Sequence, residues 1–215
     1  MIPRPSVTSK ATILEMTEKP FSDSAERNAA PILDVLRYEF SDCTAVLEIG
    51  SGTGQHAARF SRSLPHLRWQ TSDLYENHSG IHAWVEHAAL ENLLTPLSLD
   101  VMTGDVCAKA YDGVYSSNTA HIMSFVGVTR MFELVGKALV DDGVFCLYGP
   151  FRQDGNFNTA SNAAFDEGLR ARHPDMGIRE LESLDDLGGD NGLVRVRLYA
   201  MPANNHLAVW RKKGK

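Results

Sequence analysis

Three glycines at alternate positions directly follow a short apolar segment, and this feature restricts the fold of the chain more than any other. The apolar segment spans residues 45–49, and the glycines are Gly50, Gly52 and Gly54. A short apolar run of this kind is typical of a strand buried in a parallel sheet, and glycine lets the backbone turn sharply and approach a ligand closely. A second predicted strand ends in Asp73, whose carboxylate can accept hydrogen bonds from both hydroxyls of a ribose. These residues predict the nucleotide-binding half of a doubly wound sheet.

The spacing of the glycines separates two classes of nucleotide ligand. Dinucleotide-dependent dehydrogenases carry their glycines at GxGxxG spacing, whereas this chain has GxGxG and places Gln55 three residues after Gly52. Glu48 stands two residues before the first glycine, where a carboxylate would repel a pyrophosphate but suits a ligand with a cationic amino-acid end. The pattern therefore favours such a ligand over NAD(P). An NAD(P)-dependent oxidoreductase and a non-catalytic binding protein remain the alternatives.

The segment Glu48–Gly54 resembles the first motif of class I S-adenosylmethionine (AdoMet) methyltransferases. The resemblance implies AdoMet as the cofactor and places the glycine turn at its methionine part. It also implies that Asp73 holds the ribose, that Asp100 accepts from the adenine amine, and that Asn118 meets the methionine ammonium. The predicted cofactor-binding residues of these segments are Glu48, Gly50, Ser51, Gly52, Gly54, Asp73, Leu74, Asp100, Val101 and Asn118.

The hydrophobic pattern alternates between strands and helices along the chain. Helical spacing predicts helices from Pro31 to about residue 40, over about 55–63, around 81–88, over 125–139 and over about 157–171. Short apolar runs predict strands at 45–49, 67–73, 96–100, 111–118, 144–148, 194–200 and 206–212. We therefore expect an α/β fold with a doubly wound, Rossmann-like sheet of seven strands, helices on both faces and an antiparallel last strand.

Five further segments occur together and resemble a narrower group, the methyltransferase-like 26 group of class I AdoMet methyltransferases, formerly a domain of unknown function. The segments are Ala25–Asn28, Leu147–Phe151, Ser161–Phe165, Leu169–Arg172 and Met201–Asn205. The resemblance covers the chain from about residue 21 to 210 and implies no particular substrate. It places Arg27 and Asn28 near the carboxylate end of the cofactor, where a guanidinium would pair with that carboxylate.

The acceptor of the methyl group is expected to be a small molecule. Methyl transfer from a sulfonium needs a general base only when the acceptor is a hydroxyl or a protonated amine. His121, three residues after Asn118, is the best placed candidate for that base, and Tyr148 is a second predicted catalytic residue. The predicted acceptor contacts are Phe151, Arg152 and Asn205.

Composition argues against several other functions. The 215 residues carry a net charge of −6, which does not suit binding to nucleic acid or to an anionic membrane. The predicted fourth strand also lacks the Asp/Asn-Pro-Pro-aromatic signature of enzymes that methylate base amino groups. His78 and His82 lack a third ligand, so no metal site is predicted.

The same sequence sets expectations for location and domain organisation. No run of 18 apolar residues and no secretory signal occurs, and the three cysteines form no CxxC motif, so we expect a cytoplasmic protein. Residues 1–30 are expected to form an extended N-terminal arm, and residues 31–215 the methyltransferase domain. The sequence leaves the oligomeric state open.

Overall fold

The computed structural model describes residues 19–214, which form helices around one large and one small sheet. The strands of the large sheet are β1 (Ala45–Ile49), β2 (Arg68–Asp73), β3 (Leu93–Ser98), β4 (Tyr111–Ser117), β5 (Leu139–Gly149), β9 (Leu193–Met201) and β10 (Asn205–Lys212). The small sheet consists of β6 (Phe151–Gln153), β7 (Asn156–Phe157) and β8 (Arg179–Glu180). The helices are α1 (Asp23–Glu39), α2 (Gln55–Ser63), α3 (His78–Ala88), α4 (Phe125–Ala138), α5 (Ala160–Arg172) and α6 (Leu181–Asp190), with a short 3-10 helix η1 (Tyr75–Asn77) before α3.

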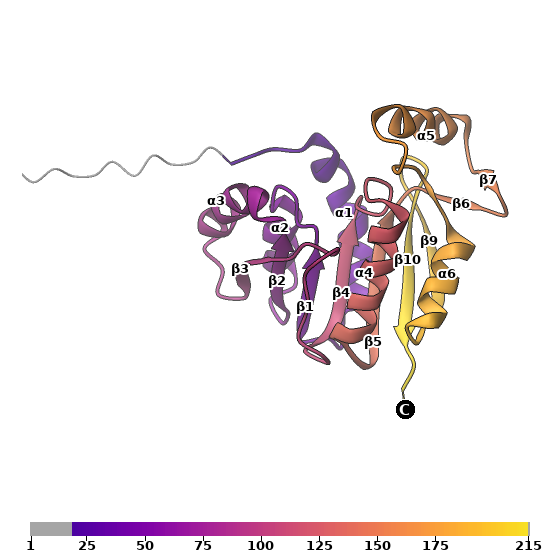
Figure 1. The fold of residues 1–215 in the computed structure, drawn as a ribbon. Helices are drawn as coiled ribbons and strands as arrows, with labels where there is room; N and C mark the ends of the chain where they lie inside the picture. Colours follow the sequence, from indigo (N-terminus) through magenta and orange to yellow (C-terminus); the bar gives the residue numbers. More distant parts are fainter. Residues whose placement is uncertain (1–18, 215) are drawn as a thin grey trace, which may run out of the picture.

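The large sheet has seven strands in the order β3-β2-β1-β4-β5-β10-β9 (Figure 1). Strands β1 to β5 pair in parallel, and β10 is antiparallel to both of its neighbours, β5 and β9. The predicted fold class, including the antiparallel last strand, is confirmed. In the parallel register Ile49 lies beside Ser72 and Ser116, so the carboxyl ends of β1, β2 and β4 meet at one edge.

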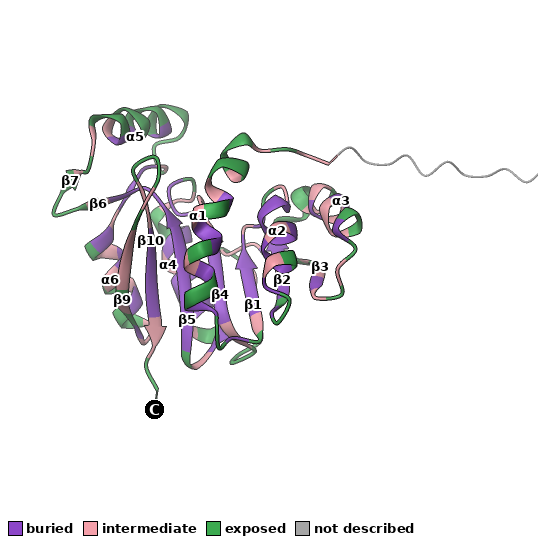
Figure 2. Cartoon of the chain, turned by 180° about the vertical axis from the view of Figure 1, so that it is seen from behind, coloured by how far each residue is buried: buried purple, intermediate pink, exposed green. Residues whose placement is uncertain are grey.

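Helices cover both faces of the sheet, because its central strands are apolar on both sides. In β1, Val46 packs into one apolar layer while Leu47 and Ile49 pack into the other. The first layer includes residues of α1 and α2, with α3 packed at its margin, and the second includes residues of α4 and α6. Figure 1 shows α4 and α6 in front of the sheet, and the reverse view in Figure 2 shows α1 in front. This two-sided burial leaves the carboxyl edge as the open place for a ligand.

Three element predictions need correction. Helix α1 begins at Asp23 rather than Pro31, and Pro31 lies inside it. The earlier start follows from Ser22, whose side chain accepts a hydrogen bond from the Ala25 N–H (3.2 Å) and caps the helix. Residues 23–30 are therefore helical rather than extended. Residues 19–22 precede the helix without regular secondary structure, and residues 1–18 of the predicted arm lie outside the described residues, so the division of the chain at residue 30 stays a prediction.

The other two corrections concern β3 and the segment after β5. Strand β3 spans residues 93–98 instead of 96–100, so Asp100 lies in the loop beyond it. The small sheet and α6 were not predicted, although Leu181 and Leu184 have helical spacing and are fully buried. The strands of the small sheet are two or three residues long, which is too short to give a periodic signal.

Candidate functional site

A cavity of about 980 Å³ opens at the carboxyl edge of the sheet. Its walls come from the first turns of α1, the glycine turn after β1, the segment after β4, the end of β5, helix α5 and the turn between β9 and β10 (Figure 1). The predicted site residues that line it are Arg27, Asn28, Glu48, Gly50, Ser51, Gly52, Asn118, His121, Tyr148 and Asn205. Segments far apart in the sequence therefore meet at one place.

The glycine turn forms the floor of this cavity, and each of its glycines has a different reason to be there. Gly50, Gly52 and Gly54 all have positive φ angles (+74°, +58° and +87°), which favour glycine. A Cβ at Gly50 would lie 2.6 Å from Cγ2 of Thr119, so glycine lets two loops approach. A Cβ at Gly52 would meet no protein atom within 4 Å, and Gly52 lines the cavity. Gly52 therefore presents a bare stretch of backbone to the cavity.

Asp73 supports the glycine turn from the end of β2. Its carboxylate accepts hydrogen bonds from the backbone N–H groups of Gly52 (2.6 Å) and Leu74 (2.7 Å), and from the Asn77 amide (2.8 Å). A carboxylate has about four acceptor positions, so roughly one is left for a ligand. One acceptor position of the buried Asp73 is therefore left for a ligand, whereas the sequence suggested contacts with both ribose hydroxyls, and Asp73 is not among the residues that line the cavity.

Glu48 is a buried carboxyl group at the wall of the cavity. One oxygen, Oε2, accepts hydrogen bonds from the Ser51 hydroxyl (2.9 Å) and the Trp69 indole N–H (3.1 Å). Burial raises the pKa of Glu48 to about 7, which the two hydrogen bonds oppose and the nearby Asp73 carboxylate reinforces. Both donors use the same oxygen. The carboxyl group is therefore held in place by side chains while it still lines the cavity.

His56 joins the start of α2 to α1. Its Nε2 lies 3.0 Å from the Ala25 carbonyl and 2.8 Å from Oδ1 of Asn28, while Nδ1 lies 3.3 Å from the Tyr115 hydroxyl. Two acceptors at Nε2 assign the proton to that nitrogen, so Nδ1 accepts from Tyr115. Burial lowers the pKa of His56 to about 4, so the ring is neutral near pH 7. A neutral, hydrogen-bonded ring of this kind holds Asn28 at the cavity wall.

Gln55 and Arg59 reinforce the same contact between α1 and α2. The Gln55 amide accepts from the Ser22 N–H (3.0 Å) and donates to Glu26 (3.1 Å), and Arg59 pairs with Glu26 (2.9 Å). The first turns of α1 are thereby fixed over the glycine turn. They carry Arg27, which lines the cavity and has no ion-pair partner within residues 19–214.

His121 and Tyr148 also line the cavity. The His121 ring packs edge-on against Phe165 of α5, with ring centroids 5.4 Å apart, and burial lowers its pKa to about 4. Burial also raises the pKa of Tyr148, although side-chain hydrogen bonds with Asn28 and Asn205 oppose that shift. Both predicted catalytic side chains therefore line the cavity, and both are uncharged near neutral pH.

The structure does not bring all predicted cofactor residues to this cavity. Gly54 packs against α3, where a Cβ would lie 3.0 Å from the Ile81 Cα. The Asp100 carboxylate accepts from the Met102 N–H (2.9 Å) and caps its own loop, and Val101 lines a separate smaller pocket. The Leu74 side chain is exposed, and only its backbone N–H takes part, as a donor to Asp73.

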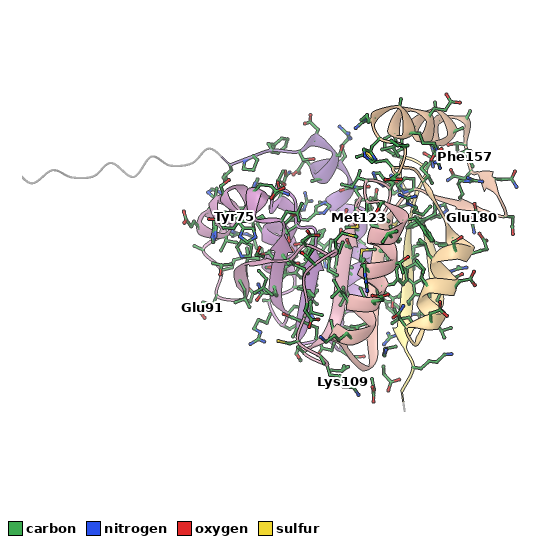
Figure 3. All side chains as sticks on the ribbon, viewed as in Figure 1. Tyr75, Glu91, Lys109, Met123, Phe157 and Glu180 are labelled. Atoms are coloured by element: carbon green, nitrogen blue, oxygen red, sulfur yellow. The ribbon has the colours of Figure 1, made fainter. Side chains whose placement is uncertain are left out.

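Two predicted acceptor residues, Phe151 and Arg152, also lie away from the cavity. Phe151 is buried in the apolar layer beneath α4 and α6. Arg152 pairs with Glu180 (3.2 Å), stacks on Phe157 (4.9 Å) and donates to the Gly155 carbonyl (2.8 Å). Figure 3 labels Phe157 and Glu180, which lie at the outer side of the molecule beside the small sheet. Arg152 therefore does not line the cavity, and its expected contact with the acceptor stays a prediction.

Sequence reasoning missed part of the cavity wall. The missed lining residues include Ser22, Ser24, His56, Ser117, Asn162 and Phe165. A helix-capping serine followed by Asp23 and Glu26 signals the start of α1, and His56 directly follows the glycine turn, so these two signals were available. Asn162 and Phe165 lie in the segment Ser161–Phe165 that carried the narrower resemblance, but no local pattern assigned them to a site, and only the folding of α5 over the sheet edge brings them to the cavity.

The residues of the cavity fit AdoMet in charge and shape. The Arg27 guanidinium suits the carboxylate of the methionine part, and the Glu48 carboxylate suits its ammonium. The open space above Gly52 allows close approach of a ligand, and Asp73 keeps an acceptor position for a ribose hydroxyl. By contrast, a carboxylate at Glu48 does not suit a dinucleotide pyrophosphate.

Two further observations concern membrane-spanning helices and metal sites among the described residues. Within residues 19–214, no helix is long and apolar enough to cross a membrane. Over the same residues, no three His, Cys, Asp or Glu side chains gather in a way that could hold a metal ion.

Comparison with models of protein families identifies the family of this chain. A family model described as "Protein of unknown function (DUF938)" matches residues 19–212, and the chain belongs to this family.

Solved structures that share this fold include several methyltransferases. An O-methyltransferase family protein from Burkholderia thailandensis is 16% identical, with a TM-score of 0.75 over 89% of this chain and 58% of that one. An O-methyltransferase family 2 protein from Planctomyces limnophilus, in complex with apigenin, is 16% identical, with a TM-score of 0.77 over 88% of this chain and 57% of that one. Human N-acetylserotonin methyltransferase, in complex with SAM (AdoMet), is 12% identical, with a TM-score of 0.74 over 88% of this chain and 53% of that one. The chain thus spans a little over half the length of these proteins and shares their Rossmann-like methyltransferase fold.

Proposed function

We propose that this member of the DUF938 family is an AdoMet-dependent methyltransferase that acts on a small-molecule acceptor. The observation that carries the proposal is that Glu48, Gly52 and Arg27 line one and the same cavity, in the part that we assign to the cofactor. A carboxylate, a bare backbone and a guanidinium match the ammonium, the chain and the carboxylate of a methionine group. The finer assignment to the methyltransferase-like 26 group rests on the segment resemblance and is part of the proposal.

The side chains of the cavity have separate roles in this account. Arg27 binds the cofactor carboxylate, and Glu48, held by Ser51 and Trp69, accepts from the ammonium. Asp73 fixes the backbone of Gly52 and accepts from one ribose hydroxyl. Asn118, at a φ of +58°, lines the cavity between the two ends, where its carbonyl or amide meets the ammonium.

The opposite end of the cavity is assigned to the acceptor. AdoMet supplies an electrophilic methyl group when it is bound. The chain orients the acceptor with Tyr148 and Asn205, and His121 and Phe165 limit the access of water. Methyl transfer is an in-line displacement, so positioning and exclusion of water account for much of the acceleration. Among the solved structures with this fold, one is in complex with SAM and another with apigenin, which supports a cofactor and a small acceptor as the ligands proposed here.

The proposal is tested by incubating the full chain with radiolabelled AdoMet and a small-metabolite extract. Transfer of the labelled methyl group to a low-molecular-mass product supports the enzyme. Binding of AdoMet with no product from any extract would instead support a non-catalytic AdoMet-binding protein. Nucleic acid added as an alternative acceptor should remain unlabelled, in keeping with the acidic chain.

Replacing Asp73 with alanine is expected to weaken AdoMet binding by about 1–3 kcal/mol, because it removes a charge-assisted acceptor for the ribose and for Gly52. Calorimetry measures the change. Asn77→Ala is the matched control, since it removes one hydrogen bond to Asp73 but keeps the carboxylate. Equal affinity of Asp73→Ala and the wild-type protein would contradict the role of Asp73.

The affinity for AdoMet is expected to depend on pH through Glu48. With a pKa of about 7, this carboxyl group is mostly ionised at pH 8 and mostly protonated at pH 6, and only the ionised form pairs with an ammonium. The dissociation constant should therefore rise about tenfold from pH 8 to pH 6. Glu48→Gln should lack this tenfold change, and any pH dependence that it keeps measures the titration of the ligand itself. His56 and His121, with pKa values of about 4, stay neutral over this range.

A further inference from the structure

The acceptor end of the cavity, defined here by His121, Tyr148, Asn162, Phe165 and Asn205, contains no strong base. Among the described residues that line the whole cavity, the only charged side chains are Arg27 and Glu48, and both are assigned to the cofactor end. Asn162 and Asn205 are amides without basicity. Any proton on the acceptor must therefore be taken by His121 or Tyr148, or be absent before the reaction.

His121 is poorly suited to take that proton. Its ring is only 7% exposed and packs against Phe165, and no side chain within residues 19–214 hydrogen-bonds to its nitrogens to raise its basicity. Burial holds its pKa at about 4, far below that of a phenolic hydroxyl, so the ring is a weak base toward such an acceptor. Tyr148, whose pKa is raised by burial, carries its own proton at neutral pH. Neither side chain can activate an unionised hydroxyl or a protonated amine.

The charges beneath this end favour an anion. Arg179, buried behind His121, donates to the carbonyls of Ala120 (2.9 Å), Asp175 (2.7 Å) and Met123, and forms no ion pair within residues 19–214. The charges that act on the pKa of His121 are those of Arg179 and Arg172, both of which lower it.

The acids nearby do not cancel this positive field. Asp166 and Asp175 act on Arg179, but Asp166 is itself paired with Arg170 (2.7 Å). The two charges that most affect the pKa of His121, those of Arg179 and Arg172, are both positive, and positive charges near the ring would stabilise an anion and repel an ammonium.

We infer that the acceptor reacts through an acidic oxygen that is already ionised, as in a phenol, an enol or a carboxylic acid, rather than through an aliphatic hydroxyl or an alkyl amine. This inference rests on the proposed methyltransferase function. The hydroxyl proton leaves to solvent before the transfer. The lone pair of the oxyanion then forms the new O–C bond while the S–C bond breaks and leaves its electrons on sulfur, so the negative charge on oxygen and the positive charge on sulfur are both lost. His121 acts as a positioning residue whose neutral ring donates one hydrogen bond to the oxyanion.

The first test determines which atom receives the methyl group. The full chain is given radiolabelled AdoMet with the metabolite extract and with a defined panel of phenols of graded acidity, an aromatic carboxylate, an aliphatic alcohol and an alkyl amine. Label on a phenolic, enolic or carboxylic oxygen supports the inference. Label on an amine nitrogen or an aliphatic hydroxyl would overturn it and leave the methyltransferase function intact. AdoMet binding without any labelled product would overturn the proposed function itself, and the inference with it.

The second test separates a positioning role of His121 from a role as a base. At saturating AdoMet, kcat/KM for an accepted phenol is measured from pH 6 to pH 9. We expect kcat/KM to rise with pH around the pKa of the phenol. This rise should move to lower pH when a more acidic phenol is used. His121→Gln should lower kcat/KM about tenfold without moving this rise, and binding of AdoMet should stay within about twofold. Two results would identify His121 as the base and overturn the inference. In one, the rise of kcat/KM with pH disappears in His121→Gln; in the other, the pH of the rise does not change with the pKa of the phenol.

The third test addresses the positive field. Arg172→Glu should lower kcat/KM for an ionised acceptor about threefold to tenfold at low salt and much less at high salt, because the side chain is exposed and its field is screened. Arg37→Glu, which changes the net charge equally on an exposed part of α1 away from the cavity, is the matched control. Equal effects of the two substitutions would count against an anionic acceptor.

Discussion

Gly52→Val is expected to abolish AdoMet binding, with a loss of affinity greater than about 100-fold. Gly52 has a φ of +58° and lines the cavity, and a Cβ placed on it meets no protein atom within 4 Å. A branched side chain would therefore project into the space that the ligand needs, and it would also strain a backbone conformation that valine rarely adopts. Calorimetric titration with AdoMet measures the loss.

A matched control separates these two effects. Gly155, in the turn between β6 and β7, also has a positive φ (+74°), and a Cβ at this position would likewise meet no protein atom within 4 Å, but Gly155 lies outside the cavity. Gly155→Val should carry a comparable strain and leave AdoMet binding unchanged. If Gly52→Val is folded by circular dichroism and binds AdoMet normally, the glycine turn is structural only.

Glu48→Gln is expected to change stability and cofactor affinity in opposite directions. Folding raises the pKa of Glu48 from 4.5 to about 7, so at pH 8 the ionised carboxylate opposes folding by about 3 kcal/mol. The amide oxygen of glutamine can accept from both Ser51 and Trp69, because both donate to the same atom in the wild-type chain. The variant should therefore unfold at a temperature on the order of 5–10 °C higher at pH 8. Its affinity for AdoMet should fall at least tenfold, because the ammonium loses its carboxylate partner.

The sign of the pH dependence provides a check. The unfolded chain releases the Glu48 proton near pH 4.5 and the folded chain only near pH 7, so the wild-type protein loses stability relative to the variant as pH rises between these values. The excess stability of Glu48→Gln over the wild-type protein should therefore increase from about pH 4.5 to about pH 7 and stay constant at higher pH. Glu39→Gln is a useful contrast, since Glu39 is equally buried but paired with Arg197 and Tyr199, and its replacement should destabilise the fold without affecting AdoMet. A less stable Glu48→Gln variant at pH 8 would contradict this account.

The parts of the site that the sequence predicted are those specified by local backbone chemistry. The strand, the glycine turn and Asp73 lie close together in the fold because the turn follows β1 directly and β2 pairs beside it, so their proximity follows from the motif alone. Helix periodicity and the apolar strands likewise indicated the doubly wound sheet and its antiparallel last strand.

The parts that the sequence did not predict depend on tertiary packing. Arg152 follows β5 closely in the sequence, but the pairing of β6 with β7 and β8 carries it to Glu180 on the outer side. Conversely, sequence analysis made no prediction for His56, and only the packing of α1 on α2 reveals its hydrogen bond to Asn28. The weak basicity of His121 depends on burial and on two distant arginines, which no local pattern encodes.

The most direct test of the central claim is calorimetric titration of the full chain with AdoMet at pH 8, with NAD⁺ and NADP⁺ titrated in parallel. We predict one AdoMet site per chain with a dissociation constant in the micromolar range, about −8 kcal/mol, and no saturable heat from either dinucleotide. Saturable binding of a dinucleotide, or no binding of AdoMet up to millimolar concentration, would contradict AdoMet as the ligand of this cavity.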